Sequence, residues 1–248
     1  MTKSASHPDY ILSAWEVSRD FGGVHALRDV ELQVARGSIT GLIGPNGSGK
    51  TTLFQVISGM DHGATGSINF DGESILGWRP SQIYQRGLAR TFQLSRVFPE
   101  LTVLENLVVA GSRHDRSVTE RAFGLLERVR LREYARVRGK NLSYGQQKLV
   151  EFLRVLMSDP ALILLDEPAA GVNPTLRQTL WDMVRHLNGL GTTFLVIEHN
   201  MEVIADLCSD VYVLSEGEII AHGDFASVRN DEKVLEAYFG KKRKSAAS

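Results

Sequence analysis

Apolar residues change their spacing twice along the chain, which divides it into strand-rich ends and a helical middle. Short apolar runs, broken by Gly22-Gly23 and Gly37, fill the first part of the chain and predict antiparallel strands. Residues 66–72 predict a further short strand that ends in a turn. Between about residues 101 and 157 the spacing becomes helical, and the apolar positions over 149–156 predict a helix with one buried face.

Strand signals return in the C-terminal third. Residues 161–165 and 194–197 are continuously apolar, which is typical of parallel strands covered on both faces. A helix over 174–188, which has a proline in its first turn, lies between them, so the three segments predict a βαβ unit. Residues 211–220 predict a hairpin and 233–239 a closing helix. The pattern therefore indicates an α/β core interrupted by a helical insertion.

Composition adds few constraints to this picture. The 248 residues suit one large domain or a core with a subdomain, and a net charge of −1 gives no general attraction to nucleic acid. Cys208, the single cysteine, lies at helical spacing from Ile204, which predicts a buried structural thiol. No apolar stretch approaches the roughly 20 residues that span a bilayer, and the N-terminus lacks a signal-peptide core. Work at a membrane would then require recruitment by another protein.

Residues 44–51 carry the strongest chemical signal. They read Gly-Pro-Asn-Gly-Ser-Gly-Lys-Thr between a predicted strand and a predicted helix, so backbone N–H groups can surround phosphate oxygens at a helix N-terminus. Lys50 supplies positive charge for the β- and γ-phosphates, and the Thr51 hydroxyl can bind Mg²⁺. We expect this phosphate loop to be exposed, with Lys50 outside the core. The expected nucleotide contacts are Gly44, Pro45, Asn46, Gly47, Ser48, Gly49, Lys50, Thr51 and Thr52.

An acidic pair follows an apolar strand in residues 162–168, which read Leu-Ile-Leu-Leu-Asp-Glu-Pro. At the end of this strand Asp166 is placed to hold Mg²⁺, and Glu167 to face an attacking water. A solvated turn could also carry two adjacent acids, but four apolar residues before Asp-Glu-Pro form a specific pattern. A phosphate loop alone leaves kinases, GTPases, helicases and transport ATPases open, and the acidic pair narrows that choice.

A third motif, residues 141–147, opens the predicted helix over 149–156 with Asn-Leu-Ser-Tyr-Gly-Gln-Gln. By itself it reads as an ordinary capped helix that begins near Ser143. Together with the phosphate loop and the acidic pair, it resembles the nucleotide-binding subunits of ABC transporters, from about Trp15 to Phe239. In that family a Leu-Ser-x-Gly-Gln signature contacts the ATP bound to the opposite subunit. The signature residues implied here are Ser143, Tyr144, Gly145 and Gln146.

The resemblance implies further site residues. Gln93, in the glutamine loop, would sense Mg²⁺ and the attacking water, and so counts among both the metal and the ATP contacts. His199, at a strand end, matches the switch histidine that contacts the γ-phosphate, and joins Glu167 as a catalytic residue. Phe21 matches the aromatic residue that stacks on adenine. The segment after Gln93 normally docks onto the permease, and Val97-Phe98 offers it an exposed apolar pair.

The resemblance also implies the fold: α/β, with a P-loop (RecA-like) ATPase core, an N-terminal antiparallel β subdomain and an inserted α-helical subdomain. Residues 1–248 would form a single nucleotide-binding domain. Its core lobe would comprise about 8–92 and 160–240, and its helical subdomain about 93–159. A solvated basic tail, 241–248, would follow.

Two departures from the general family pattern narrow the relationship. Tyr144 replaces the first glycine of the usual Leu-Ser-Gly-Gly-Gln, and residues 169–174 read Ala-Ala-Gly-Val-Asn-Pro in place of a commoner Ser-Ala-Leu-Asp loop. Asn173 can still form hydrogen bonds across a dimer. Both variants look like the ATP-binding subunits of branched-chain amino-acid importers. Residues 110–140 are short for that group, however, and residues 151–156 depart from the small-residue helix that it would have.

The resemblance thus predicts an ATPase, with ATP and Mg²⁺, that powers uptake of branched-chain or other hydrophobic amino acids. Its partners would be integral-membrane permease subunits, a second ATP-binding subunit, identical or homologous, and indirectly a periplasmic or extracellular solute-binding protein. It would lie at the cytoplasmic face of the inner (plasma) membrane, without nucleic acid. The alternatives are the ATPase of lipopolysaccharide export or urea uptake, a non-transport ABC ATPase acting on nucleic acid, and a small-molecule kinase.

Overall fold

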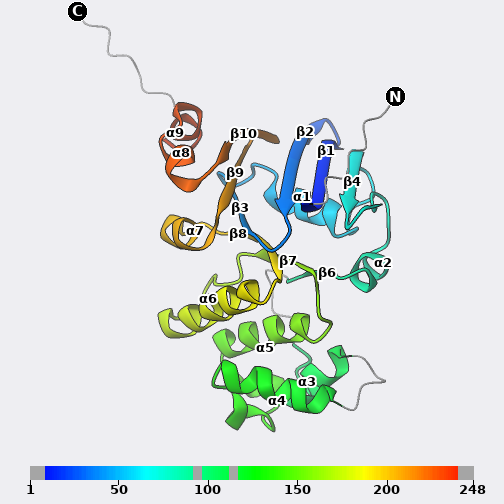
Figure 1. Cartoon of the computed structure of the whole chain (residues 1–248), viewed down its shortest axis with the longest axis vertical. Helices are drawn as coiled ribbons and strands as arrows, with labels where there is room; N and C mark the ends of the chain where they lie inside the picture. The colour runs from blue at the N-terminus through cyan, green and yellow to red at the C-terminus, as the bar shows by residue number, and fades with distance from the viewer. Residues whose placement is uncertain (1–8, 92–96, 112–116, 240–248) are drawn as a thin grey trace, which may run out of the picture. The chain divides into compact units, whose positions relative to one another are not determined.

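A computed structural model describes residues 9–91, 97–111 and 117–239. The chain divides into two compact units, residues 1–83 with 195–248 and residues 84–194 (Figure 1). Helix α2, Pro80–Gln85, contains the first point of division, and strand β8, Thr193–Ile197, contains the second. Each unit is described separately below.

The first unit contains an antiparallel sheet with the strand order β2-β1-β4-β5. Strands β1 and β2 form a hairpin in which Phe21 lies opposite Val24, and the connecting Gly22 and Gly23 both have positive φ angles. Leu12, Ala14 and Val17 of β1 are buried, and the register of the hairpin shifts between Ala14 and Val17, so the buried positions do not alternate strictly. The bounds are Tyr10–Phe21 for β1, Val24–Ala35 for β2, Thr65–Phe70 for β4 and Glu73–Ser74 for β5.

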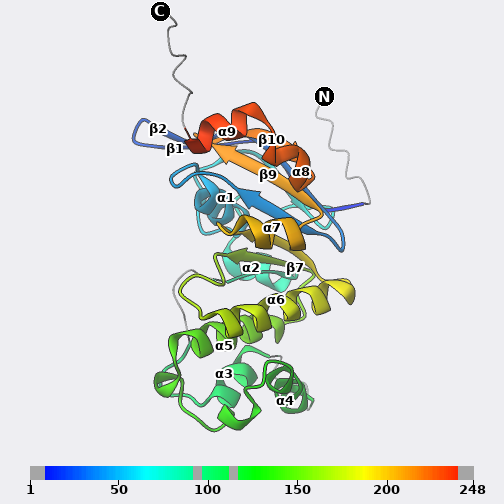
Figure 2. The same ribbon diagram turned by 90° about the vertical axis from the view of Figure 1, so that its left-hand side faces the viewer.

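The same unit contains the strand order β10-β9-β3-β8. Strands β3 and β9 are parallel, and the antiparallel β10 joins β9 as a hairpin. Helix α1 follows β3, while α7, α8 and α9 lie beside β9 (Figure 2) and enclose a core that includes Ile43, Ile204, Val211 and Val228. The bounds are Ile39–Ile43 for β3, Lys50–Ile57 for α1, Met201–Leu207 for α7, Asp210–Ser215 for β9, Glu218–Gly223 for β10, Phe225–Arg229 for α8 and Glu232–Phe239 for α9.

The second unit is mainly helical. Its two strands, β6 and β7, pair in parallel, and helix α5 lies between α3 and α6 (Figure 2). Short 3₁₀ helices, η1 and η2, connect α4 to α5. The bounds are Leu88–Arg90 for β6, Val103–Ala110 for α3, Val118–Arg128 for α4, Arg132–Tyr134 for η1, Gly139–Asn141 for η2, Tyr144–Leu156 for α5, Leu162–Asp166 for β7 and Pro174–Gly189 for α6.

These elements confirm the predicted fold class, an α/β nucleotide-binding architecture with an antiparallel β portion and parallel strands. The predicted βαβ segments appear as β7, α6 and β8, with Pro174 in the first turn of α6. The prediction of one buried face for α5 is wrong, because the six consecutive residues 148–153 are all buried. Contacts from both α3 and α6 explain this burial, and it includes two charged side chains.

Candidate functional site

The phosphate loop joins β3 to α1 in the first unit, and its glycines are required by close backbone packing. Gly44 has a φ of 152°, and a Cβ atom there would lie 2.0 Å from the carbonyl oxygen of Leu214. Gly49, with a φ of 108°, would place a Cβ atom 2.5 Å from the carbonyl oxygen of Ala26. Only glycine fits both positions without moving a backbone, so the loop is fixed in shape by its neighbours.

Lys50 lies inside this loop. Its side chain is 6% exposed, and Nζ donates hydrogen bonds of 2.8 Å to the carbonyl oxygens of Gly44 and Pro45. The expectation that Lys50 is exposed is therefore wrong: the loop curls around its own ammonium group and satisfies it with main-chain acceptors. Asn46 and Gly47 at the tip, and Thr51 on the first turn of α1, are exposed.

Two further expected site residues lie in the first unit. His199 is exposed two residues beyond β8, and its N–H donates to Glu198 Oε2 at 3.2 Å. Phe21 ends β1 with 44% of its surface exposed. The guanidinium carbon of Arg19 lies 3.9 Å from the centroid of the Phe21 ring, and Arg19 is itself held by Asp61 at 2.7 Å. One face of the Phe21 ring is therefore covered by a fixed cation, a cation–π contact that sequence reasoning missed.

The acidic pair lies at the end of β7 in the second unit. Asp166 is the last residue of the strand, and Glu167 follows in a left-handed conformation with a φ of 47°, which is uncommon outside glycine. Arg90, at the end of β6, forms an ion pair with Asp166, in which Arg90 Nη2 lies 2.9 Å from Asp166 Oδ2. Both side chains are almost completely buried. Sequence reasoning missed Arg90, because a three-residue strand gives no periodic signal.

The signature opens helix α5 as predicted. Ser143 is the N-cap: its Oγ accepts a hydrogen bond from the backbone N–H of Gln146 at 3.3 Å, and Gln146 Oε1 accepts from the N–H of Ser143 at 2.9 Å. This reciprocal capping box fixes the first turn. Gly145 is buried, and a Cβ atom there would lie 2.8 Å from Leu176 Cδ1. The glycine therefore permits close packing between the start of α5 and α6.

The two departures from the general family pattern touch one another. Gly171 has a φ of 71°, and a Cβ atom on it would lie 3.1 Å from Tyr144 Cε1. The tyrosine ring of the signature thus lies against the loop that follows the acidic pair. Asn173, in the same loop, caps α6 by accepting a hydrogen bond from the N–H of Leu176 at 3.0 Å. Its amide has a local structural task in addition to any contact across a dimer.

Gln93 lies outside the described residues, as do its neighbours 92 and 94–96. The chain enters this segment at Thr91, which is buried and donates its backbone N–H to the carbonyl oxygen of Leu164 at 3.0 Å. The residue that precedes the glutamine loop, Thr91, is therefore hydrogen-bonded to β7.

The next described residues, 97–102, form a loop that we call the docking loop, after the role that the family resemblance led us to expect for it. Asn106, on α3, is completely buried and holds this loop: Nδ2 donates to the carbonyl oxygens of Phe98 at 3.1 Å and Thr102 at 2.9 Å, and Oδ1 accepts from the N–H of Phe98 at 2.8 Å. Such bonds satisfy an amide that would otherwise be costly to bury. Phe98 nevertheless leaves 44% of its surface exposed, while Val97 is half-buried.

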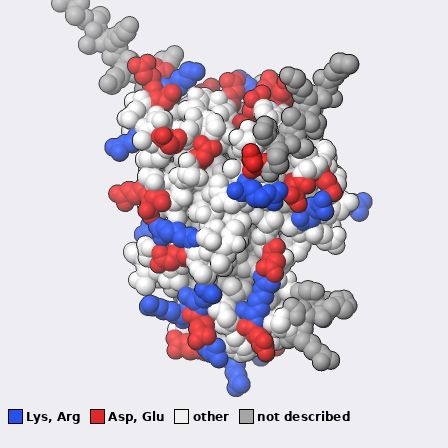
Figure 3. Space-filling model, viewed as in Figure 1, with Lys and Arg blue, Asp and Glu red and all other residues white. Residues whose placement is uncertain are grey.

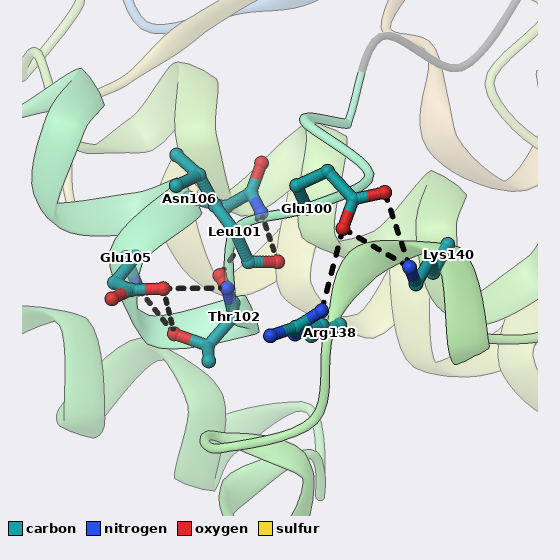
Figure 4. Close-up of polar contacts among 7 residues, drawn as sticks. All are labelled: Glu100, Leu101, Thr102, Glu105, Asn106, Arg138 and Lys140. Carbon is teal, nitrogen blue, oxygen red and sulfur yellow. Dashed lines mark hydrogen bonds and ion pairs between the residues drawn. The ribbon is translucent and has the colours of Figure 1, made fainter.

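Charged and capping residues fasten the rest of the docking loop (Figure 4). Glu100 accepts from Lys140 at 3.0 Å and lies 3.4 Å from Arg138. Thr102 caps α3 through a reciprocal pair of bonds with Glu105. The loop thus presents an exposed aromatic side chain from a backbone that is anchored at both ends.

The surface carries both positive and negative side chains. On the face drawn in Figure 3, basic and acidic side chains are interspersed. Among the described residues, no helix combines the length and hydropathy that crossing a bilayer requires.

A glycine-cradled loop around a lysine, between a strand and a helix, defines the class of P-loop nucleotide-binding proteins. The profile described as ABC transporter matches residues 27–170, and one described as branched-chain amino acid ATP-binding cassette transporter matches residues 218–243. The chain belongs to the ABC transporter family, as an ATP-binding ATPase subunit.

Curated relatives match over nearly their whole length and are named for the same transport process. A probable branched-chain amino acid transport ATP-binding protein of Archaeoglobus fulgidus is 37% identical over 93% of this chain and 95% of its own. The high-affinity branched-chain amino acid transport ATP-binding protein of Escherichia coli K12 is 35% identical over 93% of this chain and 98% of its own.

Solved structures agree with this family. A nucleotide-free ATP-binding cassette from an ABC transporter superposes with a TM-score of 0.85 at 36% identity, and covers 94% of this chain and 100% of its own. A cassette in its ADP conformation gives 0.84 at 36% identity, over 94% of this chain and 99% of its own.

Proposed function

We propose that this chain hydrolyses ATP to power uptake of branched-chain amino acids. The observation that carries the ATPase is the phosphate loop, whose Gly44 and Gly49 tolerate no side chain and whose backbone encloses Lys50. The expected domain plan is part of the proposal, with a core lobe of about 8–92 and 160–240 and a helical subdomain of about 93–159. ATP is bound by residues 44–52, and adenine stacks on the free face of Phe21 opposite Arg19.

Mg²⁺ fits the chemistry of the available donors. Mg²⁺ bound with a nucleotide needs only one or two protein oxygen ligands, because phosphate oxygens and water complete its octahedron. Thr51 offers an exposed hydroxyl, Asp166 a carboxylate and Gln93 an amide oxygen. When bound, Mg²⁺ neutralises charge that develops on the phosphates.

The protein's own residues supply the remaining chemistry. Glu167 accepts the proton of the attacking water, and Gln93 orients that water. Lys50 exchanges its main-chain acceptors for the β- and γ-phosphate oxygens, and His199 steadies the γ-phosphate. Phosphoryl transfer to water depends mainly on such positioning and charge neutralisation, with little covalent chemistry left to the protein.

A second ATP-binding subunit, identical or homologous, completes the site. Ser143, Tyr144, Gly145 and Gln146 contact the nucleotide of the opposite subunit, and Asn173 bonds across the same interface. Support comes from the exposure of Ser143 and Tyr144 at the start of α5, where the N–H groups of the first turn favour an anion. ATP closes this dimer and hydrolysis reopens it. Integral-membrane permease subunits convert closure into transport, and a solute-binding protein delivers the amino acid.

Branched-chain amino acids are proposed as the substrate because both relatives described above are named for branched-chain amino acid transport. The match to each of them covers nearly its whole length. The protein would then lie at the cytoplasmic face of the inner (plasma) membrane, as a peripheral subunit. Lipopolysaccharide export, urea uptake and nucleic-acid machines are not favoured by these relatives.

Uptake in cells tests the substrate. Cells that make the Glu167→Gln chain in place of the native one should lose accumulation of labelled leucine, isoleucine and valine, because the motor no longer turns over. Uptake of labelled urea by the same cells should be unchanged. Loss of urea uptake with normal leucine uptake would contradict the proposed substrate while leaving the ATPase intact.

The docking loop gives a prediction about membrane association. Phe98→Glu should release the protein from membranes without lowering its solubility, because an exposed apolar side chain next to the glutamine loop suits a cytoplasmic helix of the permease. Fractionation of cell membranes measures the bound share. Leu190→Glu is the matched control, since Leu190 is also an exposed apolar residue but lies outside the docking loop. Equal membrane association of the Phe98→Glu and native proteins would remove the docking role.

A further inference from the structure

Helix α5 contains three charged side chains at intervals of three residues: Lys148, Glu151 and Arg154. Lys148 is 3% exposed, Glu151 is 5% exposed and Arg154 is half-buried. This spacing puts them on neighbouring positions of the helix surface, over about 9 Å of its length. Because apolar residues of similar volume often stabilise a protein as well or better, three charges in such positions call for another explanation than packing.

The Lys148 end of this series lies near the loop that follows the acidic pair, because Lys148 Nζ is 5.9 Å from the centroid of the Tyr144 ring, which packs against Gly171. Lys148 Nζ lies 3.8 Å from Glu151 Oε2. Burial lowers the pKa of the Lys148 ammonium, while the negative charges of Glu151, Asp166 and Glu167 partly offset that shift. Lys148 is therefore within electrostatic reach of both carboxylates that follow β7, in surroundings where solvent screens charges weakly.

The other end reaches the surface at the docking loop. The guanidinium carbon of Arg154 lies 4.5 Å from the centroid of the Phe98 ring, within the range of a cation–π contact. Burial lowers the pKa of Arg154, and the charge of Glu151 acts against that shift. On the surface of α5, Glu151 therefore neighbours a cation on each side: Lys148 lies three residues before it, and Arg154, next to the Phe98 ring, lies three residues after it.

We propose that Lys148, Glu151 and Arg154 form a buried charge relay that links the acidic pair to Phe98. The three act as positioning residues. When positive charge arrives beside Asp166 and Glu167, the pull of these acids on Lys148 weakens, and Lys148 moves closer to Glu151. Glu151 then holds Arg154 less strongly, and Arg154 interacts more strongly with the Phe98 ring. The docking loop thereby reports whether the site is loaded. The relay rests on the proposed function, because the arriving positive charge is that of the Mg²⁺ ion itself, which accompanies ATP and lies on the side of the acidic pair.

A tryptophan at the surface end of the relay makes the link measurable in the isolated protein. Phe98→Trp keeps an aromatic face for Arg154. The emission of the three native tryptophans is measured on the native protein and subtracted from that of the variant. Adding Mg²⁺ with a non-hydrolysable ATP analogue should change the emission of the introduced tryptophan. Combining Phe98→Trp with Glu151→Gln should remove that change in a protein that calorimetry shows still binds the analogue.

Two further variants, made in the Phe98→Trp background, separate a relay from a packing role. Lys148→Met with Glu151→Gln removes both members of the buried pair, so no unpaired buried charge remains and the protein should fold. It should bind the analogue without a change in the emission of the introduced tryptophan. Glu127→Gln is the matched control: it breaks an exposed carboxylate–arginine pair with Arg132 in the same unit, and should keep the full emission change.

The outcomes distinguish the two proposals. A full emission change in Glu151→Gln, or its recovery in the double variant, would overturn the relay. So would an introduced tryptophan whose emission stays constant in Phe98→Trp protein that binds the analogue normally. Failure of the Phe98→Trp protein to bind the analogue at all would instead contradict the proposed nucleotide function.

Discussion

Glu167→Gln should lower ATP turnover by about 10²–10⁴-fold, the usual contribution of a positioned general base, and leave ATP binding intact. The substitution keeps the side-chain volume and its hydrogen-bonding capacity but removes the group that accepts the proton of water. Phosphate release measures turnover, and calorimetry measures binding. Glu16→Gln is a matched control, because Glu16 is another glutamate with a positive φ, 50°, and lies exposed on β1, outside the acidic pair's own strand and loop.

The same variant should accumulate as a dimer when Mg²⁺ and ATP are added, since bound ATP joins two subunits and is no longer cleaved. Ser143→Arg in that background should prevent the dimer, because it puts bulk and charge at the exposed start of α5. Light scattering gives the mass of the species present. A Glu167→Gln protein that hydrolyses ATP normally as a monomer would refute the mechanism. A weak homodimer would agree with it if the natural partner is a homologous subunit.

Lys50→Ala should weaken Mg·ATP binding by at least about 100-fold, because losing charge-assisted hydrogen bonds to phosphates costs about 3 kcal/mol or more. Calorimetry measures the affinity. The hydrogen bonds of Lys50 to Gly44 and Pro45 are lost as well, so thermal unfolding should be recorded for the same protein. Lys50→Met is the control, since it keeps the apolar stem and removes the ammonium. Native affinity in a folded Lys50→Ala protein would exclude the assigned nucleotide site.

Local constraints explain which parts of the site could be predicted from the sequence. The phosphate loop is recognisable because its three glycines and its lysine lie within seven consecutive residues, and Gly44, Gly47 and Gly49 each have a positive φ angle, which glycine adopts without strain. The cap at Ser143 is predictable for the same reason, since a capping box involves only residues three apart. Strand β7 is predictable because it is apolar along nearly its whole length.

The features that sequence reasoning missed depend on contacts that the sequence does not display. Arg90 meets Asp166 across 76 positions of the chain, from a strand too short to show a period. Lys148 and Glu151 look like solvent-facing residues of an amphipathic helix, and only the packing of α5 between α3 and α6 buries them. A lysine in a glycine-rich loop has no obvious partner, yet the loop's own carbonyl groups accept the hydrogen bonds of Lys50.

The enclosed position of Lys50 has a consequence for the stability of the subunit between two rounds of hydrolysis. A motor of this kind releases its nucleotide at every turn and must survive until the next molecule arrives. An ammonium group buried without acceptors would destabilise that interval and invite local unfolding, with exposure to proteases. The carbonyl oxygens of Gly44 and Pro45 accept hydrogen bonds from Lys50, so the loop can satisfy this ammonium group from within itself, and ligand binding adds to the stability that these bonds provide.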